Sequence, residues 1–176
     1  MSFFKDDLKN IRALLLDVDG VLSKDTSPLD ENGDPMRTAN VKDGFAIRIA
    51  IEAGLVVGVI TGGALKSVRL RHEKLGVEWY YENVRDKVAC LDDFVSRTGI
   101  RPEEILFMGD DIVDYNIMLK AGVATCPADA VPEIKLISRY VSDRKGGEGC
   151  VRDIIEQVLR AQGKWFNHGV SPKQAF

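Results

Sequence analysis

The sequence predicts an α/β fold with a doubly wound, Rossmann-like parallel sheet. Apolar runs typical of buried strands alternate along the chain with segments whose apolar residues recur at helical spacing. Three of the apolar runs end in carboxylates, a hydroxyl or glycines. In an open α/β sheet such strand ends share the edge where ligands bind. The same residues therefore predict both the fold and the place of a site.

The first half of the chain predicts two strands and two helices. The leucines at 14–16 predict a buried strand. Residues 45–53 have apolar positions at helical spacing, with Asp43 as the expected N-cap and Gly54 as the end. The valine-rich run at 55–60 predicts the second strand. Residues 64–75 predict a helix that Gly76 ends.

The second half continues the alternation. The expected strands are a short aromatic one at 79–81, a buried one at 105–108, and two edge strands at 123–125 and 140–141. The expected helices are 87–98, 115–120 before Gly122, and a last amphipathic helix at 150–161. Repeated strand–helix units with short loops favour parallel pairing.

Two segments do not follow this alternation. Residues 23–40 are polar and rich in turn-forming residues, and Asn32-Gly33 could close a β-hairpin there. Residues 164–176 lack periodicity but carry aromatic side chains, so this tail is either unstructured or docked on another surface. The aromatic residues of the tail are Trp165, Phe166 and Phe176. We expect one domain over residues 1–163 and a flexible tail after it.

Composition bounds the class of protein. The chain has 176 residues, 45% of them hydrophobic, and a net charge of −3. This balance favours neither a nucleic-acid nor a membrane surface. The N-terminus has no apolar segment like that of a signal peptide, and no run is long enough to span a membrane. Cys90, Cys126 and Cys150 are far apart in sequence and are expected to be free thiols in a reducing cytoplasm.

Four groups with phosphate or metal chemistry occur in order along the chain. Asp17 and Asp19 follow the first strand, and Thr61, Gly62 and Gly63 follow the second. Lys87 stands at the start of a helix, and Asp110 with Asp111 follows the strand at 105–108. Carboxylates supply oxygen ligands for Mg²⁺, whereas a hydroxyl, glycine N–H groups and a lysine donate to phosphate oxygens. The pattern predicts a phosphate and magnesium site.

These residues resemble the four motifs of the haloacid dehalogenase phosphatases. The resemblance implies that Asp17 is the nucleophile, and that Asp19 is the general acid and base. It also implies that Mg²⁺ is held by Asp17, Asp110 and the backbone carbonyl of Asp19. Phosphoryl oxygens would be bound by Thr61, Gly62, Gly63 and Lys87. Asp111 and Asp114 would orient the metal site and Lys87, although acids also favour the start of a helix for structural reasons alone.

The spacing of the motifs predicts a member without a cap domain. Too few residues separate Asp19 from Thr61, or Thr61 from Lys87, to hold one. A site without a cap is open to water unless a neighbouring subunit covers it. We therefore expect a homo-oligomer.

Within the superfamily, the chain resembles the family of 3-deoxy-D-manno-octulosonate 8-phosphate (KDO 8-phosphate) phosphatases. The residues that carry the resemblance are DVDGVLSKD at 17–25, NVKDG at 40–44, GDDIVDYNIM at 109–118, PADAVPEI at 127–134, KGGEG at 145–149 and AQGK at 161–164. It implies a tetramer in which the 23–40 hairpin and the tail reach a neighbouring subunit, the tail folding over its active site. It also places near the sugar acid the residues Asn40, Val41, Lys42, Asp43, Gly44, Arg48 and Arg71. For Arg48 and Arg71 a solvated helix face is the structural alternative.

One position departs from the family pattern. Many relatives carry arginine where this chain has Gly63, so two substrates remain open. The eight-carbon acid phosphate is favoured by the aromatic tail, and the alternative is a nine-carbon keto acid 9-phosphate of the sialic-acid type. A non-catalytic oligomerisation module is an alternative of another class, but every motif acid is present.

Overall fold

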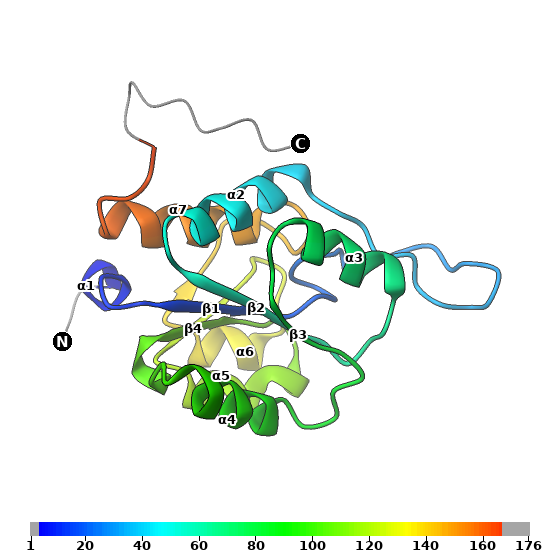
Figure 1. Cartoon of the computed structure of the whole chain (residues 1–176). Helices are drawn as coiled ribbons and strands as arrows, with labels where there is room; N and C mark the ends of the chain where they lie inside the picture. The colour runs from blue at the N-terminus through cyan, green and yellow to red at the C-terminus, as the bar shows by residue number, and fades with distance from the viewer. Residues whose placement is uncertain (1–3, 167–176) are drawn as a thin grey trace.

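The computed structural model describes residues 4–166, in which six parallel strands form a sheet (Figure 1). The strand order is β3-β2-β1-β4-β5-β6. The strands are β1 (Ala13–Leu16), β2 (Val56–Ile60), β3 (Trp79–Tyr81), β4 (Ile105–Met108), β5 (Val123–Cys126) and β6 (Tyr140–Val141). The chain runs outward from β1 to β3, then returns to place β4 beside β1. The crevice at this switch in strand order is where open α/β sheets bind ligands.

Helices cover both faces of the sheet (Figure 1). One face carries α1 (Phe4–Leu8), α2 (Val41–Glu52), α3 (Lys66–Lys74) and α7 (Cys150–Ala161). The other carries α4 (Lys87–Thr98), α5 (Tyr115–Lys120) and α6 (Pro132–Ile137). Two short 3₁₀ turns, η1 (Pro102–Glu104) and η2 (Ile112–Asp114), precede β4 and α5. The arrangement confirms the predicted doubly wound α/β fold.

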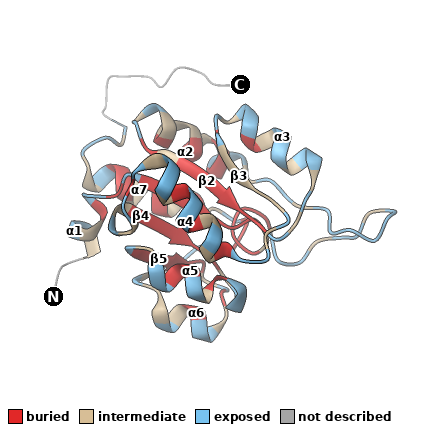
Figure 2. Ribbon diagram, turned by 60° about the horizontal axis from the view of Figure 1, so that its bottom comes forward, coloured by how far each residue is buried: buried red, intermediate tan, exposed pale blue. Residues whose placement is uncertain are grey.

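The two faces of β1 feed two separate apolar clusters. Leu14 and Leu16 pack toward α2 and α7, whereas Ala13 and Leu15 pack toward α4 and α5. All four residues are fully buried. Figure 2 shows the neighbouring strands β2 and β4 mostly in the red of buried residues. Each buried leucine contributes about 1.5–3 kcal/mol relative to an exposed one. The resulting two-sided core fixes the strand ends that carry the site.

Most predicted elements are confirmed to within a few residues, and two interpretations were wrong. The N-cap of α2 is Asn40, whose side chain accepts from the backbone N–H of Lys42 (2.9 Å) and Asp43 (3.3 Å). The helix therefore begins four residues before its predicted start, and Asp43 lies in its first turn. β5 is an interior strand because β6 pairs with its outer side. Helices α1 and α6, of five and six residues, were not predicted.

The 23–40 segment projects from the sheet edge as a long loop with a tight tip (Figure 1). Leu29 and Pro35 form an isolated antiparallel bridge, and Gly33 takes φ +84° in the turn between them. The side chain of Asp30 accepts from the N–H groups of Asn32 and Asp34. The predicted hairpin is thus present as one bridge and a turn.

The start of the tail is fixed to α7. The N–H groups of Lys164 and Trp165 both donate to the carbonyl of Leu159. The Trp165 ring packs against the α2–α7 core, 4.6 Å from the guanidinium carbon of Arg152. The expectations for Phe176 and for a tail over a neighbouring site fall outside the described residues. Among the helices of residues 4–166, none is long and apolar enough to cross a membrane.

Candidate active site

The predicted motif residues meet at the carboxyl edge of the sheet. Asp17 follows β1 and Asp110 follows β4, on the two sides of the switch in strand order. Lys87 enters from the first position of α4. A cavity of about 720 Å³ lies over this edge. Its lining includes Asp17, Asp19, Asp25, Arg37, Gly62, Gly63, Val84, Arg85, Lys87, Asp110, Asp111 and Val113.

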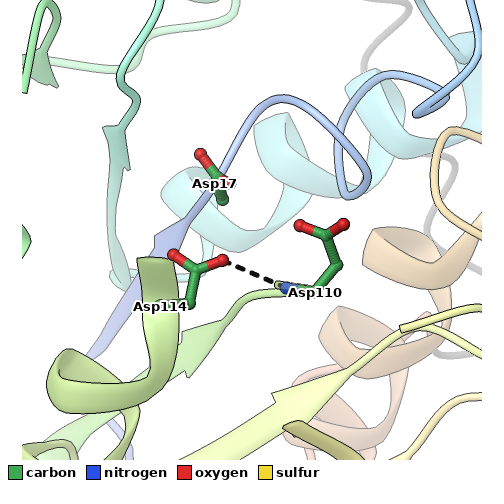
Figure 3. Close-up of side chains that lie close together, drawn as sticks. All are labelled: Asp17, Asp110 and Asp114. Carbon is green, nitrogen blue, oxygen red and sulfur yellow. Dashed lines mark hydrogen bonds between the residues drawn. The ribbon is translucent and has the colours of Figure 1, made fainter. Parts of the chain in front are cut away.

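Three carboxylates form a compact cluster. Asp17, Asp110 and Asp114 each have a carboxylate oxygen within 4.8 Å of the other two (Figure 3). Asp114 is fully buried, and its Oδ2 accepts from the backbone N–H of Asp110 at 3.1 Å. Two glycines create the space: a Cβ at Gly20 would overlap the Asp110 carboxylate, and one at Gly109 would lie 2.5 Å from the Asp114 side chain. Neither position therefore accepts a larger residue without displacing an acid.

The cluster carries more negative charge than its surroundings neutralise. Burial raises the pKa of Asp17 to about 7, with a further contribution from Asp114 that Lys87 opposes. Burial likewise raises the pKa of Asp110 to about 8, with Asp17 adding to the effect. Both shifts mean that the ionised carboxylates, removed from water and close to other acids, are poorly stabilised by the protein alone. Hard oxygen donors whose negative charge is not fully compensated suit a divalent cation such as Mg²⁺.

Lys87 is the cation that contacts the cluster. Its Nζ lies 2.6 Å from Asp114 Oδ1 and 3.0 Å from Asp17 Oδ1. Asp86 caps α4 by accepting from the N–H of Val88 and of Ala89, which fixes the helix start from which Lys87 reaches inward. Burial alone would lower the pKa of Lys87, but Asp17 and Asp114 raise it above its usual value. Asp114 therefore lies where it can hold Lys87 against Asp17.

The second motif forms a turn beside this cluster. The N–H of Thr61 donates to Tyr81, and the Thr61 hydroxyl accepts from the N–H of Gly63 at 3.2 Å. Thr61 is buried, whereas Gly62 is exposed and Gly63 half-buried at the cavity wall. The turn thus holds a hydroxyl and backbone donors next to the cavity.

Asp19 has a partner that the sequence did not reveal. The guanidinium of Arg37, from the returning limb of the hairpin, holds both Asp19 oxygens through Nε (2.9 Å) and Nη2 (3.0 Å). The Asp19 carboxylate lies outside the three-acid cluster, which agrees with a metal contact through its backbone only. Asp111 is exposed and accepts from the N–H of Ile112 at the start of η2. This contact matches the structural alternative for Asp111.

A second pocket of about 230 Å³ lies between α2 and α3. It brings together four of the predicted substrate residues, Asn40, Asp43, Gly44 and Arg71. The other three lie outside its lining: Val41 and Lys42 are exposed, and Arg48 pairs with Glu52 on the same helix at 3.2 Å. The pocket also contains buried His72, whose pKa burial lowers to about 4.

The loop at 145–149 supports the first motif, which explains its clustered glycines. A Cβ at Gly146 would overlap the backbone carbonyl of Gly20, and the N–H of Gly147 donates to Val21. Asp129 accepts from the N–H of Gly146 at 2.9 Å. The close packing of this loop on residues 17–24 gives a physical reason for Gly146 and Gly147, which the sequence alone does not.

The chain is similar to known proteins over most of its length. A model of the haloacid dehalogenase-like hydrolases matches residues 77–154. A 3-deoxy-D-manno-octulosonate 8-phosphate phosphatase of Escherichia coli K12 is 38% identical over 89% of this chain and 83% of that protein. The crystal structure of the Yersinia pestis phosphatase of that name superposes with a TM-score of 0.87 at 33% identity, covering 91% of this chain and 86% of that one. The Moraxella catarrhalis phosphatase, solved with magnesium, phosphate and KDO, gives a TM-score of 0.87 at 26% identity and 92% coverage of both chains.

Proposed function

Because the chain belongs to the family of 3-deoxy-D-manno-octulosonate 8-phosphate phosphatases, among the haloacid dehalogenase-like hydrolases, we propose that it hydrolyses KDO 8-phosphate to KDO and phosphate. The observation that carries the proposal is the meeting of Asp17, Lys87 and Asp110 beside a cavity large enough for a sugar phosphate. Relatives with this name match nearly the whole chain.

Asp17 is the nucleophile in this proposal. One of its oxygens attacks phosphorus, and the bond from phosphorus to the sugar oxygen breaks, leaving an aspartyl-phosphate. Lys87 lies 3.0 Å from Asp17 and favours the ionised form that attack requires. Asp114 holds Lys87 in that position.

Asp19 is the general acid and base in this proposal. It gives a proton to the leaving sugar oxygen, then takes one from the water that attacks the aspartyl-phosphate. Its carboxylate is 45% exposed at the cavity wall, where a leaving group and water can reach it. Arg37 fixes the orientation of this carboxylate.

The carboxylates of Asp17 and Asp110, with the backbone carbonyl of Asp19, are the proposed magnesium ligands. When bound, Mg²⁺ supplies positive charge that offsets the repulsion between an anionic nucleophile and an anionic substrate. The Thr61 hydroxyl and the N–H groups of Gly62 and Gly63 bind the phosphoryl oxygens. The pocket with Asn40, Asp43, Gly44 and Arg71 receives the sugar acid.

We further propose a homotetramer in the cytoplasm. Large apolar side chains are exposed on the hairpin and beside it, among them Leu29 (65%), Met36 (54%) and Val41 (61%). A second subunit that covers them removes this apolar area from water. It would also wall the open side of the cavity.

Phosphate release from KDO 8-phosphate with Mg²⁺ tests the function. The wild type should turn over this ester with a higher kcat/KM than a nine-carbon keto acid 9-phosphate or glucose 6-phosphate. Asp17→Asn should abolish release from all three because it keeps the shape and removes the nucleophilic charge. Near-normal turnover by Asp17→Asn would refute the covalent mechanism, and a preference for the nine-carbon ester would reassign the substrate.

A further inference from the structure

Arg37 lies at the junction of the two cavities. It lines the 720 Å³ cavity over the acid cluster, and it also lines the 230 Å³ pocket that contains Arg71. Its side chain is 12% exposed. The pair with Asp19 and a bond from Nη1 to the carbonyl of Pro35 (3.1 Å) fix the guanidinium. A half-buried arginine with these partners is oriented before any ligand arrives.

The absence of a side chain at Gly63 leaves the space that this guanidinium occupies. A Cβ at position 63 would lie 2.8 Å from Arg37 Nη2 and 3.7 Å from Asp19 Oδ2. Arg71 has the same arrangement, because a Cβ at Gly44 would lie 2.8 Å from its Nη2. Two arginines therefore line one pocket, and each packs against a glycine.

The guanidinium of Arg37 keeps donors for a ligand. Arginine has five N–H donors in a planar fork. Partners that the structure describes, the Asp19 carboxylate and the Pro35 carbonyl, take three of these donors. Two N–H groups thus remain while the pair with Asp19 stays intact. Planar carboxylates are the anions that such a fork binds with greatest geometric specificity.

From this geometry we infer that Arg37 is a specificity-determining residue, which binds the carboxylate of the sugar acid together with Arg71. The inference rests on the proposed function. The phosphoryl end already has donors in Thr61, Gly62, Gly63 and Lys87, whereas the pocket away from the nucleophile has Arg37 and Arg71 as its two arginines. A carboxylate is the group that distinguishes a sugar acid phosphate from a neutral sugar phosphate.

The test compares two esters and one product. The variant Arg37→Gln removes the fork and keeps a polar side chain. We expect it to raise KM for KDO 8-phosphate about 10- to 100-fold, the effect of losing charge-assisted hydrogen bonds. Binding of KDO itself, measured by calorimetry, should weaken by a similar factor. Because the variant also removes the partner of Asp19, kcat should fall for both esters, and the discriminating quantity is KM. KM for glucose 6-phosphate, which has no carboxylate, should change less than about 3-fold. Arg101→Gln, an exposed arginine paired with Glu104, is the matched control and should leave all three values unchanged.

The outcomes separate this inference from the proposed function. A wild type that does not hydrolyse KDO 8-phosphate refutes the proposed function. A wild type that does, with Arg37→Gln raising KM for both esters equally, assigns Arg37 to the phosphoryl end and overturns the inference. Unchanged KM values and unchanged KDO binding overturn it as well.

A second variant tests whether the guanidinium of Arg37 needs the space that Gly63 leaves. Gly63→Ala keeps the N–H of residue 63 but places a methyl group against Arg37 Nη2. It should raise KM for KDO 8-phosphate in the same direction as Arg37→Gln, by a smaller factor. The double variant should be no worse than Arg37→Gln alone, because both changes act on one interaction. If the double variant raised KM by the product of the two single-variant factors, the two residues would act independently and the coupling would be contradicted.

Discussion

The pH dependence of Mg²⁺ binding tests whether the three-carboxylate cluster is the metal site. The pKa of Asp17 is raised to about 7 and that of Asp110 to about 8, so both hold protons as pH falls through this range. A hard cation binds the ionised carboxylates, so protons compete with it. The affinity for Mg²⁺ must therefore fall as pH falls.

The size of the effect follows from the two values. Between pH 9 and pH 6.5, protonation of Asp110 weakens binding about 30-fold and protonation of Asp17 about 4-fold. Together they give roughly 100-fold, and binding at pH 6.5 releases between about one and two protons per Mg²⁺. Without Asp110 only the smaller factor remains.

Calorimetric titration of the metal-free protein measures both quantities. Proton release is obtained from two buffers with different ionisation enthalpies. Asp110→Asn should bind Mg²⁺ more weakly at pH 9 and show a shallower pH dependence. Asp92→Asn, which removes an exposed acid paired with Lys120, is the control for loss of one negative charge. An affinity that is constant from pH 6.5 to 9, or an Asp110→Asn protein that binds like wild type, would place the metal elsewhere.

Four further predictions concern stability, the tail and assembly. Burial raises the pKa of Asp43 to about 6, so the folded state binds a proton more tightly than the unfolded state and the stability of the wild type falls as pH rises from about 4 to 6. The unfolding free energy of Asp43→Asn, measured in urea, should therefore increase by roughly 2 kcal/mol relative to wild type between pH 4.5 and pH 8. A constant difference over this range would contradict the prediction. Trp165→Ala should lower the unfolding free energy by about 1–3 kcal/mol because its ring packs on α7. Deletion of residues 164–176 should weaken affinity for KDO 8-phosphate while hydrolysis of a small phosphate ester changes little, and identical kinetics on both substrates would refute a closing tail. Light scattering should show a tetramer, and a fully active 19.5 kDa monomer would refute the proposed assembly.

The strand ends could be predicted from sequence because their geometry is local. An apolar run followed by Asp17, or by Asp110, marks a buried strand and its carboxyl end. The rule that parallel strands present these ends at one edge then brings the acids together. The role expected for Lys87 came from the resemblance to the family motifs, and only its place at a helix start came from the local pattern. For the two acids, a local pattern and one general rule of topology were sufficient.

Arg37 could not be predicted in this way. It lies in an irregular loop, 18 positions after Asp19, and no periodicity places it. Its position depends on the path of the hairpin and on the missing Cβ of Gly63. The interior position of β5 was missed for a related reason. Strand order depends on packing across the whole sheet, and β6 is only two residues long.

The fold supplies specific partners for some carboxylates of the site and leaves others undercompensated. Asp114, fully buried, accepts from Lys87 and from the N–H of Asp110, so its charge is balanced within the protein. Asp19 is balanced by Arg37. Asp17 shares Lys87 with Asp114, and the pKa of Asp110 is raised by burial and by its acidic neighbours. The uncompensated charge is thus concentrated on the two side chains proposed to bind the cation. With pKa values of about 7 and 8, Asp17 and Asp110 are partly protonated near neutral pH without a metal, and we expect Mg²⁺ binding to release these protons.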